Sequence, residues 1–334
     1  MISPFLHKGG DNLYRILITS RGKTYEPIVK DNFTIKRSMN FEPSTLTFEL
    51  LKDDTIDYQE GANVKVYDEG NMIYTGFIVT KSRDKNQIIK NTCYDSMWYF
   101  KNRDTMKFED MTYSEIIQEV CGRQGMITGE IEDTGYKIKG TIHRNKEYFT
   151  IFKDAYDMTL AHNGEIFTLF DKNGKICLKK PSSMMIEKAI TFDNSCNFSY
   201  KTSIENSYNR IKLSHNDDEK KELKYYIKED MNHVKEWGLR QYMAESSKSE
   251  DMDGKAARLL ELLNRKERTL EIKDCIGNWE VRGGSLIPVV LGAIGDIAVN
   301  SMMFVSSVNH KVKDGIHLMD VKVYNKDIMP LGGK

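Results

Sequence analysis

The chain has 334 residues, of which 40% are hydrophobic and 29% are charged, enough apolar material for two or three domain cores and too much for global disorder. Its 49 basic and 49 acidic residues cancel, so it lacks the positive field that concentrates proteins on nucleic acid, and we expect no specific nucleic-acid partner. The longest apolar stretch, near residue 290, is broken by proline, glycine and aspartate, which predicts no stable membrane insertion. The N-terminal segment lacks the apolar core of a signal peptide, which predicts a protein kept in a cytosol.

Five cysteines occur in the chain: Cys93, Cys121, Cys177, Cys196 and Cys275. They form neither an even set nor a CxxC pair, which argues against a disulfide framework and against structural zinc. We interpret them as small buried hydrophobic residues.

Residues 1–95 predict a first β module. Six short runs, rich in β-branched and aromatic residues, are separated by turn-forming residues at spacings of about ten. The runs are LYRILITS, NFTIKRSM, STLTFELL, ANVKVYD, MIYTGFIVTKS and QIIKNTCYD. In the third run, Leu46, Phe48 and Leu50 alternate with polar residues, so one face is buried and the other is hydrated. Such a series predicts an antiparallel barrel or sandwich.

The stretch VKVYDEGNMIYTGFIV, residues 64–79, predicts a hairpin formed by the fourth and fifth of these strands. Its tip consists of Asp68, Glu69, Gly70 and Asn71. Glycine and asparagine tolerate the positive φ that a tight turn requires. Gly76, inside the second strand, indicates a bulge or a close backbone approach.

Residues 96–196 predict a small α+β insert domain. The apolar spacing in MTYSEIIQEVCGRQGM predicts a short helix with Thr112 as its N-cap, Glu115 as the capping-box partner and a stop at Gly122. A second helix is predicted over residues 146–162, before an Asn-Gly stop. The two alternating runs of EIFTLFDKNGKICLKK then predict a hairpin.

Residues 197–334 predict a second β module. Its strand-like runs are NFSYKTSIENSYNRIKLSH, TLEIKDC, SLIPVVLGA, FVSSVNHKVKD and HLMDVKVYN. The charged run NDDEKKELKYYIKED predicts a solvated loop that leads into an edge strand, and an apolar stripe predicts one packed helix over about 254–266. The fold class is therefore α+β, predominantly antiparallel β, with two β modules that flank the insert.

No motif predicts catalysis. GxGxxG in a strand-to-helix context, GxxxxGK[ST], HExxH and GxSxG are all missing from the sequence, so phosphate-binding, zinc-peptidase and hydrolase signatures are unsupported. His310 and His317 lie seven residues apart around a turn and could face each other across a hairpin, but metal catalysis needs at least three ligands. We predict no catalytic, cofactor-binding or metal-binding residue and no enzyme activity.

The 17 tyrosines and 17 methionines favour an assembly protein. Aromatic and methionine side chains are enriched at protein interfaces because they bury a large area at low entropic cost.

Several stretches follow one another in a recognisable order. They are VKVYDEGNMIYTGFIV, IENSYNRIKLS at 204–214, HVKEWGLRQYM at 233–243, AARLLELLN, TLEIKDC, VRGGSLIPV and VNHKVKDGIHLMDVKV. This series, from about Leu13 to Tyr324, resembles the baseplate hub proteins of contractile phage tails, in particular the hub of PBSX-type defective prophages and the related late-control D proteins. Two departures stand out: Trp237 occupies a position where the family usually has tyrosine, and the charged segment 217–230 is less typical.

The resemblance implies that residues 1–95 and 197–334 each form a β-barrel similar to a tail-tube protein, with 96–196 as the insert. Three copies would form a homotrimeric ring of six similar barrels that matches the sixfold tail tube to the threefold central spike. The resemblance further implies the tail tube, spike, tape-measure and baseplate wedge proteins as partners, and no cofactor. Assembly would take place in the bacterial host cytoplasm, and the protein would end in the baseplate of a virion tail or of a headless, bacteriocin-like particle. The hairpin tip, residues 68–71, becomes a candidate contact with the next ring, and the helix near 254–266 would lie outside the ring or between subunits.

Two other functions stay open at this point. A baseplate-associated peptidoglycan hydrolase is one, because some hubs are fused to lysozyme or peptidase domains, although no catalytic segment is recognisable here. A tail protein that binds host-surface carbohydrate is the other, favoured by the aromatic content and disfavoured by the helical insert.

Overall fold

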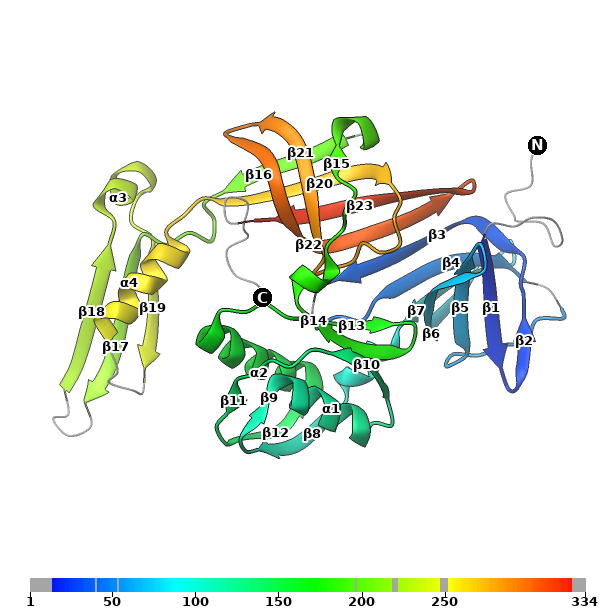
Figure 1. The fold of residues 1–334 in the computed structure, drawn as a ribbon, viewed down its shortest axis with the longest axis horizontal. Helices are drawn as coiled ribbons and strands as arrows, with labels where there is room; N and C mark the ends of the chain where they lie inside the picture. Colours follow the sequence, from blue (N-terminus) through cyan, green and yellow to red (C-terminus); the bar gives the residue numbers. More distant parts are fainter. Residues whose placement is uncertain are drawn as a thin grey trace. The chain divides into compact units, whose positions relative to one another are not determined.

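The computed structural model describes residues 14–39, 41–52, 54–195, 197–217, 222–246 and 252–325, which divide into two compact units (Figure 1). Unit 1 comprises residues 1–198 and 271–323, and unit 2 comprises residues 199–270 and 324–334. All three boundaries fall inside strands, β16, β20 and β23. The predicted third domain, residues 197–334, therefore contributes to both units.

The first part of unit 1 contains the six strands that the sequence predicts, plus one short strand, β2. The strands are β1 (Tyr14–Ser20), β2 (Lys23–Tyr25), β3 (Val29–Ser38), β4 (Thr45–Leu51), β5 (Asn63–Asp68), β6 (Asn71–Arg83) and β7 (Ile88–Tyr94). All of their pairings with one another are antiparallel. In β4, Leu46, Phe48 and Leu50 are at most 1% exposed, as the alternation predicts, and each contributes about 1.5–3 kcal/mol through burial.

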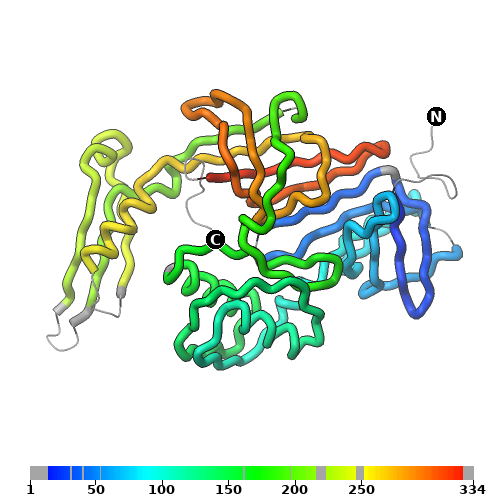
Figure 2. Tube along the Cα trace, in the orientation of Figure 1, coloured from blue at the N-terminus to red at the C-terminus, as the bar shows by residue number. Residues whose placement is uncertain are grey.

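The C-terminal strands join the same sheet. They are β20 (Glu267–Ile276), β21 (Leu286–Ile294), β22 (Ile297–Lys313) and β23 (Ile316–Tyr324), with β15 (Ile190–Thr191) and β16 (Asn197–Ser203) beside them. The first half of β22 pairs with β21, and its second half pairs with β3, from Ser307 opposite Ser38 to Lys313 opposite Asn32. Figure 2 shows these two segments, far apart in sequence, running side by side.

Because β22 bridges the two groups of strands, they form one thirteen-stranded sheet. Its order is β16-β20-β23-β22-β3-β4-β7-β6-β5-β1-β2, with β21 and β15 attached beside β22. The α+β class and the predominance of antiparallel strands are confirmed. The described strands do not close into a barrel, however, because the order runs from β16 at one end to β2 at the other.

The insert has its own core. Helix α1 (Tyr113–Arg123) begins at Thr112, whose hydroxyl accepts from the Glu115 N–H while the Glu115 carboxylate accepts from the Thr112 N–H, so the predicted capping box is confirmed. Helix α2 (Tyr148–Asn163) ends at Gly164, which has a φ of +71°. Together α1 and α2 bury aromatic and aliphatic residues, among them Phe100, Phe108, Tyr113, Ile117, Phe152 and Phe167.

Short elements complete the insert and the segment that follows it. The strands are β8 (Arg103–Phe108), β9 (Met111–Thr112), β10 (Ile127–Ile131), β11 (Lys137–Ile138), β12 (Thr141–Glu147), β13 (Thr168–Lys172) and β14 (Lys175–Lys179). The 3-10 helices are η1 (Ser96–Lys101), η2 (Pro181–Met184) and η3 (Phe192–Asn194). The hairpin predicted at EIFTLFDKNGKICLKK is β13 and β14.

Unit 2 is a three-stranded sheet covered by one helix. Strand β17 (Arg210–Asp217) lies between β18 (Glu222–Glu229) and β19 (Gln241–Ser246). Helix α4 (Met252–Leu263) occurs where a helix was predicted, and it packs Met252 and Ala256 against Ile211 and Leu213 of β17. The short helix α3 (Met231–Trp237) was not predicted.

Four cysteines, Cys93, Cys121, Cys177 and Cys275, are free and buried, as predicted, and Cys196 lies outside the described residues. Within the described ranges, every helix is too short or too polar to cross a membrane.

Candidate functional site

The tip of the β5–β6 hairpin is a two-residue turn. Glu69 and Gly70 have φ values of +46° and +81°, which suits the right-handed twist of a hairpin. Asp68 and Asn71 face each other as the last pair of the register. The predicted hairpin is therefore confirmed, and Glu69 occupies a left-handed conformation that glycine adopts at lower energetic cost.

Two of the side-chain hydrogen bonds that tie this hairpin to other segments of unit 1 lie at or beside its tip. Trp279 Nε1 donates to Asp68 Oδ2 at 2.7 Å, and Asn173 Nδ2 donates to the Met72 carbonyl at 3.0 Å. Trp279 lies in the loop between β20 and β21, and Asn173 lies in the turn between β13 and β14. The tip thus stands where three parts of the chain meet.

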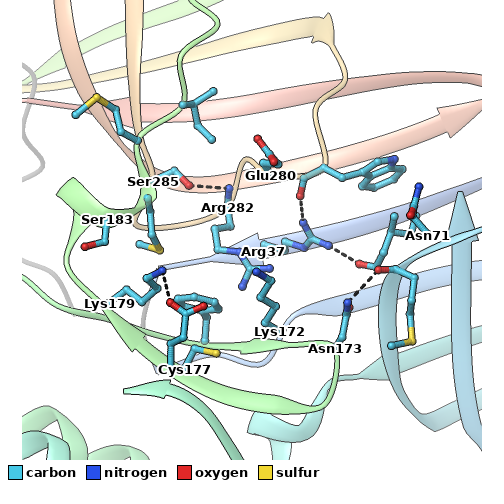
Figure 3. Close-up of a pocket in the computed structure, with 18 of the residues that line it drawn as sticks. Arg37, Asn71, Lys172, Asn173, Cys177, Lys179, Ser183, Glu280, Arg282 and Ser285 are labelled. Atoms are coloured by element: carbon cyan, nitrogen blue, oxygen red, sulfur yellow. Dashed lines mark hydrogen bonds and ion pairs between the residues drawn. The ribbon is translucent and has the colours of Figure 1, made fainter. Parts of the chain in front are cut away.

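At this junction lies a cleft of about 590 Å³, the hairpin cleft (Figure 3). Asp68, Glu69 and Asn71 line one side of it, and Gly70 is exposed at the turn. The other walls come from the β13–β14 hairpin, from residues 183–186 and from the loop at 279–285. The role of the tip as a contact with a second ring stays a prediction.

Two arginines lie on the inner wall of the cleft. Arg37, at the end of β3, is 6% exposed, and its Nη1 and Nη2 each donate at 2.6 Å, to the carbonyls of Trp279 and Ile73. Arg282 Nη1 donates to the Asp171 carbonyl at 3.0 Å, and its guanidinium lies 4.2 Å from the centre of the Phe170 ring. Burial, and secondarily repulsion from Arg282, lower the pKa of Arg37 to about 9.

Two buried carboxylates lie near these arginines. Asp95 is 2% exposed and accepts from the N–H groups of Ser44 at 2.9 Å and Met97 at 3.1 Å. Asp171 accepts from the N–H groups of Ser96 at 3.2 Å and Gly174 at 2.7 Å. Burial, and secondarily repulsion from Asp171, raise the pKa of Asp95 to about 7. The pKa of Asp171 is also raised, chiefly by burial.

His310 and His317 face each other, as the sequence predicts. Their Nδ1 and Nε2 atoms are 3.1 Å apart, and His310 Nε2 lies 3.0 Å from the Val281 carbonyl. Because a carbonyl only accepts, His310 carries its proton on Nε2, so its Nδ1 accepts from His317 Nε2. Burial lowers both pKa values, that of His310 well below its ordinary value and that of His317 to about 4. The ring of His317 stacks on the ring of Trp279, with the ring centres 3.7 Å apart. The two histidines therefore support the loop between β20 and β21, which forms one wall of the cleft.

Two glycines allow that loop to pack closely. A Cβ on Gly283 would lie 2.1 Å from the Met39 nitrogen, and one on Gly284, whose φ is +89°, would lie 2.1 Å from the Thr168 hydroxyl. A larger residue is excluded at Gly283 because the backbone of residues 38 and 39 cannot yield, and at Gly284 because the Thr168 side chain is buried and the φ is positive. The stretch VRGGS, part of the family resemblance, therefore has a packing role.

A second candidate surface is one face of the large sheet, the polar sheet face. It is lined by Thr34, Lys36, Thr45, Thr47, Glu271, Ser307, Asn309, Asp320 and Lys322 around a hollow of about 410 Å³. Beside it, Lys311 Nζ donates to Asp274 at 2.6 Å and to Asp320 at 2.7 Å. The face is hydrophilic and of mixed charge across strands from both ends of the chain.

The described part of the chain holds no group of three or more His, Cys, Asp or Glu side chains arranged to bind a metal ion. The paired acids Glu130 and Glu132 make structural contacts: Glu130 with the Lys179 ammonium at 2.7 Å, and Glu132 with the Lys180 N–H at 2.9 Å.

Comparison with known proteins places the fold among phage tail proteins. The 43 kDa tail protein of prophage MuSo2 from Shewanella oneidensis superposes with a TM-score of 0.69, over 94% of this chain and 99% of that protein, at 15% sequence identity. At this identity the similarity defines the fold.

The family follows from sequence. The model of a family described as YQBQ-like matches residues 33–324, and the chain belongs to this family. It is 22% identical to the uncharacterized protein YqbQ of Bacillus subtilis (strain 168), over 91% of this chain and 95% of the relative. It is 25% identical to the phage-like element PBSX protein XkdQ of the same organism, over 82% of this chain and 84% of the relative.

Sequence reasoning found the hairpin tip and the histidine pair but missed the charged groups of the cleft. Arg37 lies on the same face of β3 as the buried Phe33 and Ile35. An arginine at a position where the alternation predicts an apolar residue is a sequence signal that could have identified it. Asp95, Asp171 and Arg282 carry no such signal, because Asp95 directly follows β7, Asp171 lies at the end of β13 beside a turn, and Arg282 lies in a loop, where polar residues are ordinary.

Proposed function

We propose that the chain is the structural baseplate hub of a contractile tail and that three copies form a ring with six similar β modules. Such a ring would adapt a sixfold tail tube to a threefold central spike. The observation that carries the proposal is the single sheet that strands from both ends of the chain build together, with polar side chains of β3, β4, β20, β22 and β23 around one hollow. The fold of prophage tail proteins and membership of the YqbQ-like family support the same assignment.

In this proposal the polar sheet face lines the channel of the ring. Its threonine, serine and asparagine side chains present hydroxyl and amide groups, and its Lys36 and Lys322 are balanced by Glu271 and Asp320. A balanced wall lets the tape-measure protein and a polyanion such as DNA pass, because no uncompensated positive field retains them.

The contacts of the ring follow from its edges and ends. The sheet is open, and open edges tend to pair with further strands, which favours sheet continuation between subunits. The exposed Glu69 and Gly70 of the hairpin tip would meet the neighbouring ring. Residues 1–95 and 197–334 would be the two similar modules of each subunit, and residues 96–196 would be the insert between them. Partners in this scheme are the tail tube, spike, tape-measure and wedge proteins, in the baseplate of a virion tail or tail-like particle.

The first test is the mass of the purified chain in solution, followed by electron-microscopy imaging with tube and spike proteins. We expect a trimer, or a trimer that forms when the spike is added. A stable monomer that associates with neither protein refutes the hub assignment.

The second test places the polar sheet face. Thr47→Cys lies on this face, and Lys107→Cys is a matched control on the exposed β8 strand, where the Lys107 side chain is 62% exposed. In the isolated chain a bulky maleimide should label both introduced cysteines. The four described native cysteines are buried and should therefore stay unlabelled. In the assembled tail only Lys107→Cys should remain labelled at the same rate, and equal labelling of both would contradict a channel-lining face.

A further inference from the structure

The hairpin cleft contains two buried guanidiniums, those of Arg37 and Arg282, which Asp95 and Asp171 attract electrostatically without forming a direct ion pair among the described residues. Within the described residues, neither Arg37 nor Arg282 lies within ion-pair distance of a carboxylate. Their guanidiniums donate hydrogen bonds to main-chain carbonyls. Because a guanidinium has five N–H donors in a planar fork, each arginine has further donors for a ligand. Burying a charge without a hydrogen-bonded partner is costly, so an anion that entered the cleft would be stabilised.

The buried carboxylates nearby do not remove this capacity. Both Asp95 and Asp171 are occupied by backbone N–H groups, two each, and neither lines the cleft. The two guanidiniums do line it, and Figure 3 shows them in its middle, between the β13–β14 hairpin and the loop that carries Glu280.

The remaining walls are suited to a peptide. Apolar side chains also line the cleft: Met72, Ile73, Phe170, Met184, Met185 and Ile186. Met185 is 57% exposed, and methionine adapts its shape to different apolar partners. The volume of about 590 Å³ lies within the range of roughly 300–1,000 Å³ for ligand clefts. A free inorganic anion would leave this apolar surface uncovered.

The charges on the outer part of the cleft limit the number of acids that can bind. Glu69, Glu130 and Glu280 line it and are exposed. Glu130 is paired with Lys179 at 2.7 Å. Glu69 and Glu280 outnumber the remaining exposed cation, Lys172, so a second carboxylate would meet net repulsion.

We propose that the hairpin cleft binds a short extended segment of a partner protein in which one glutamate or aspartate is flanked by apolar residues. The carboxylate lies against the guanidiniums of Arg282 and Arg37, where charge-assisted hydrogen bonds are strong, and the flanking side chains pack on the methionine and isoleucine wall. The inference does not depend on ring formation, because every residue of the cleft comes from one chain.

The experiment is a selection from a library of random capped pentapeptides on the immobilised full chain, with sequencing of the retained pool. We expect peptides with a single acid between apolar residues to be enriched about ten-fold over their glutamine or asparagine counterparts, the size of one charge-assisted hydrogen bond. Arg282→Gln should abolish this preference. Arg123→Gln is the matched control, since Arg123 is exposed, pairs with Glu119 at 2.8 Å and lies outside the cleft.

A second variant guards against loss of folding in Arg282→Gln. Met185→Asp changes an exposed side chain of the cleft, so the fold is retained while the new charge repels the acid, and the preference should again be lost. Equal retention of acidic and amide peptides by the native chain overturns the proposal, as does a preference that survives in both cleft variants. Displacement of the selected peptides by inorganic phosphate at equal concentration would also overturn it, because it would indicate an ion site. A chain that stays monomeric but retains acidic peptides would contradict the hub assignment and leave the peptide-binding proposal standing.

Discussion

Strand β3 carries two different kinds of burial on one face. Phe33 and Ile35 enter an apolar core in which nearly every neighbour is aliphatic or aromatic, whereas Arg37, two residues further, enters the hydrogen-bonded junction below the hairpin cleft. The apolar core gains stability from area removed from water, which does not depend on pH or on fine geometry. The junction gains specificity from directed bonds, and each bond left unmade costs free energy. The core thus holds the sheet, and the junction determines where the hairpin tip stands.

The apolar core should show the largest single effect. Phe48 is 1% exposed and packs among the buried residues of β1 to β7. Phe48→Ala should lower the free energy of unfolding by about 3–5 kcal/mol, through lost burial and the cavity left behind, as measured by denaturant unfolding. Thr47→Ala, on the opposite face of the same strand, should change it by less than about 0.5 kcal/mol. Similar losses for both variants would show that the sheet does not have one buried face.

The same contrast explains what the sequence could predict. Alternation in β4 and the capping box at Thr112 are local patterns, so the main strands and the helix α1 were predicted. Strand β22 could not be assigned to both groups of strands, because its pairing with β3 joins residues more than 260 positions apart, and no local pattern records such a partner. The junction is likewise assembled from Arg37, Asp171 and Arg282, whose proximity only the fold creates, whereas the histidine pair was predictable because one turn connects its members.

Within the junction, the Trp279 bond to the hairpin tip should show the next largest effect. Trp279→Phe keeps the aromatic packing against Phe33 and His317 but removes the only described donor to the Asp68 carboxylate, whose Oδ1 is already buried without a partner. The free energy of unfolding should fall by about 1–3 kcal/mol. In a double-mutant cycle, Trp279→Phe should cost much less in an Asp68→Ala background, and an undiminished cost would show that packing, not the hydrogen bond, is responsible.

The junction, unlike the core, should also respond to pH. The pKa values of His310 and His317 are lowered in the folded chain, so both are neutral there and become protonated more readily when the chain unfolds. Their contribution to stability is present above pH 6.5 and is lost as the pH falls towards about 4. Since His317 is partly exposed, we expect a loss of about 1–2 kcal/mol over this range.

Asp95 opposes this trend. Its pKa is raised to about 7 in the folded chain, so unfolding releases its proton and the folded state gains relative stability as the pH falls below 7. Denaturant unfolding between pH 7.5 and 4 should therefore show that Asp95→Asn loses more stability on acidification than the native chain does, because only the native chain gains from protonation of Asp95. A loss that is unchanged in Asp95→Asn would assign the pH dependence to other groups.

The smallest effect is expected at the exposed end of the hairpin, where neither kind of burial operates. Glu69 has a φ of +46° and is exposed, so Glu69→Gly relieves a left-handed conformation that disfavours a side chain, partly offset by the greater freedom of glycine in the unfolded chain. Glu69→Asn also relieves the strain, because asparagine tolerates the left-handed region. Asparagine has less conformational freedom than glycine in the unfolded chain, so less of the gain is lost. Glu69→Asn should raise the free energy of unfolding by about 0.5–1 kcal/mol, with Glu69→Gly between it and the native chain. If the tip meets a neighbouring ring, Glu69 makes a contact that both variants lack. Both should then fold at least as well as the native chain but assemble less completely with tube protein, as seen by electron-microscopy imaging. Unaltered assembly would show that the tip is a solvated turn without a contact.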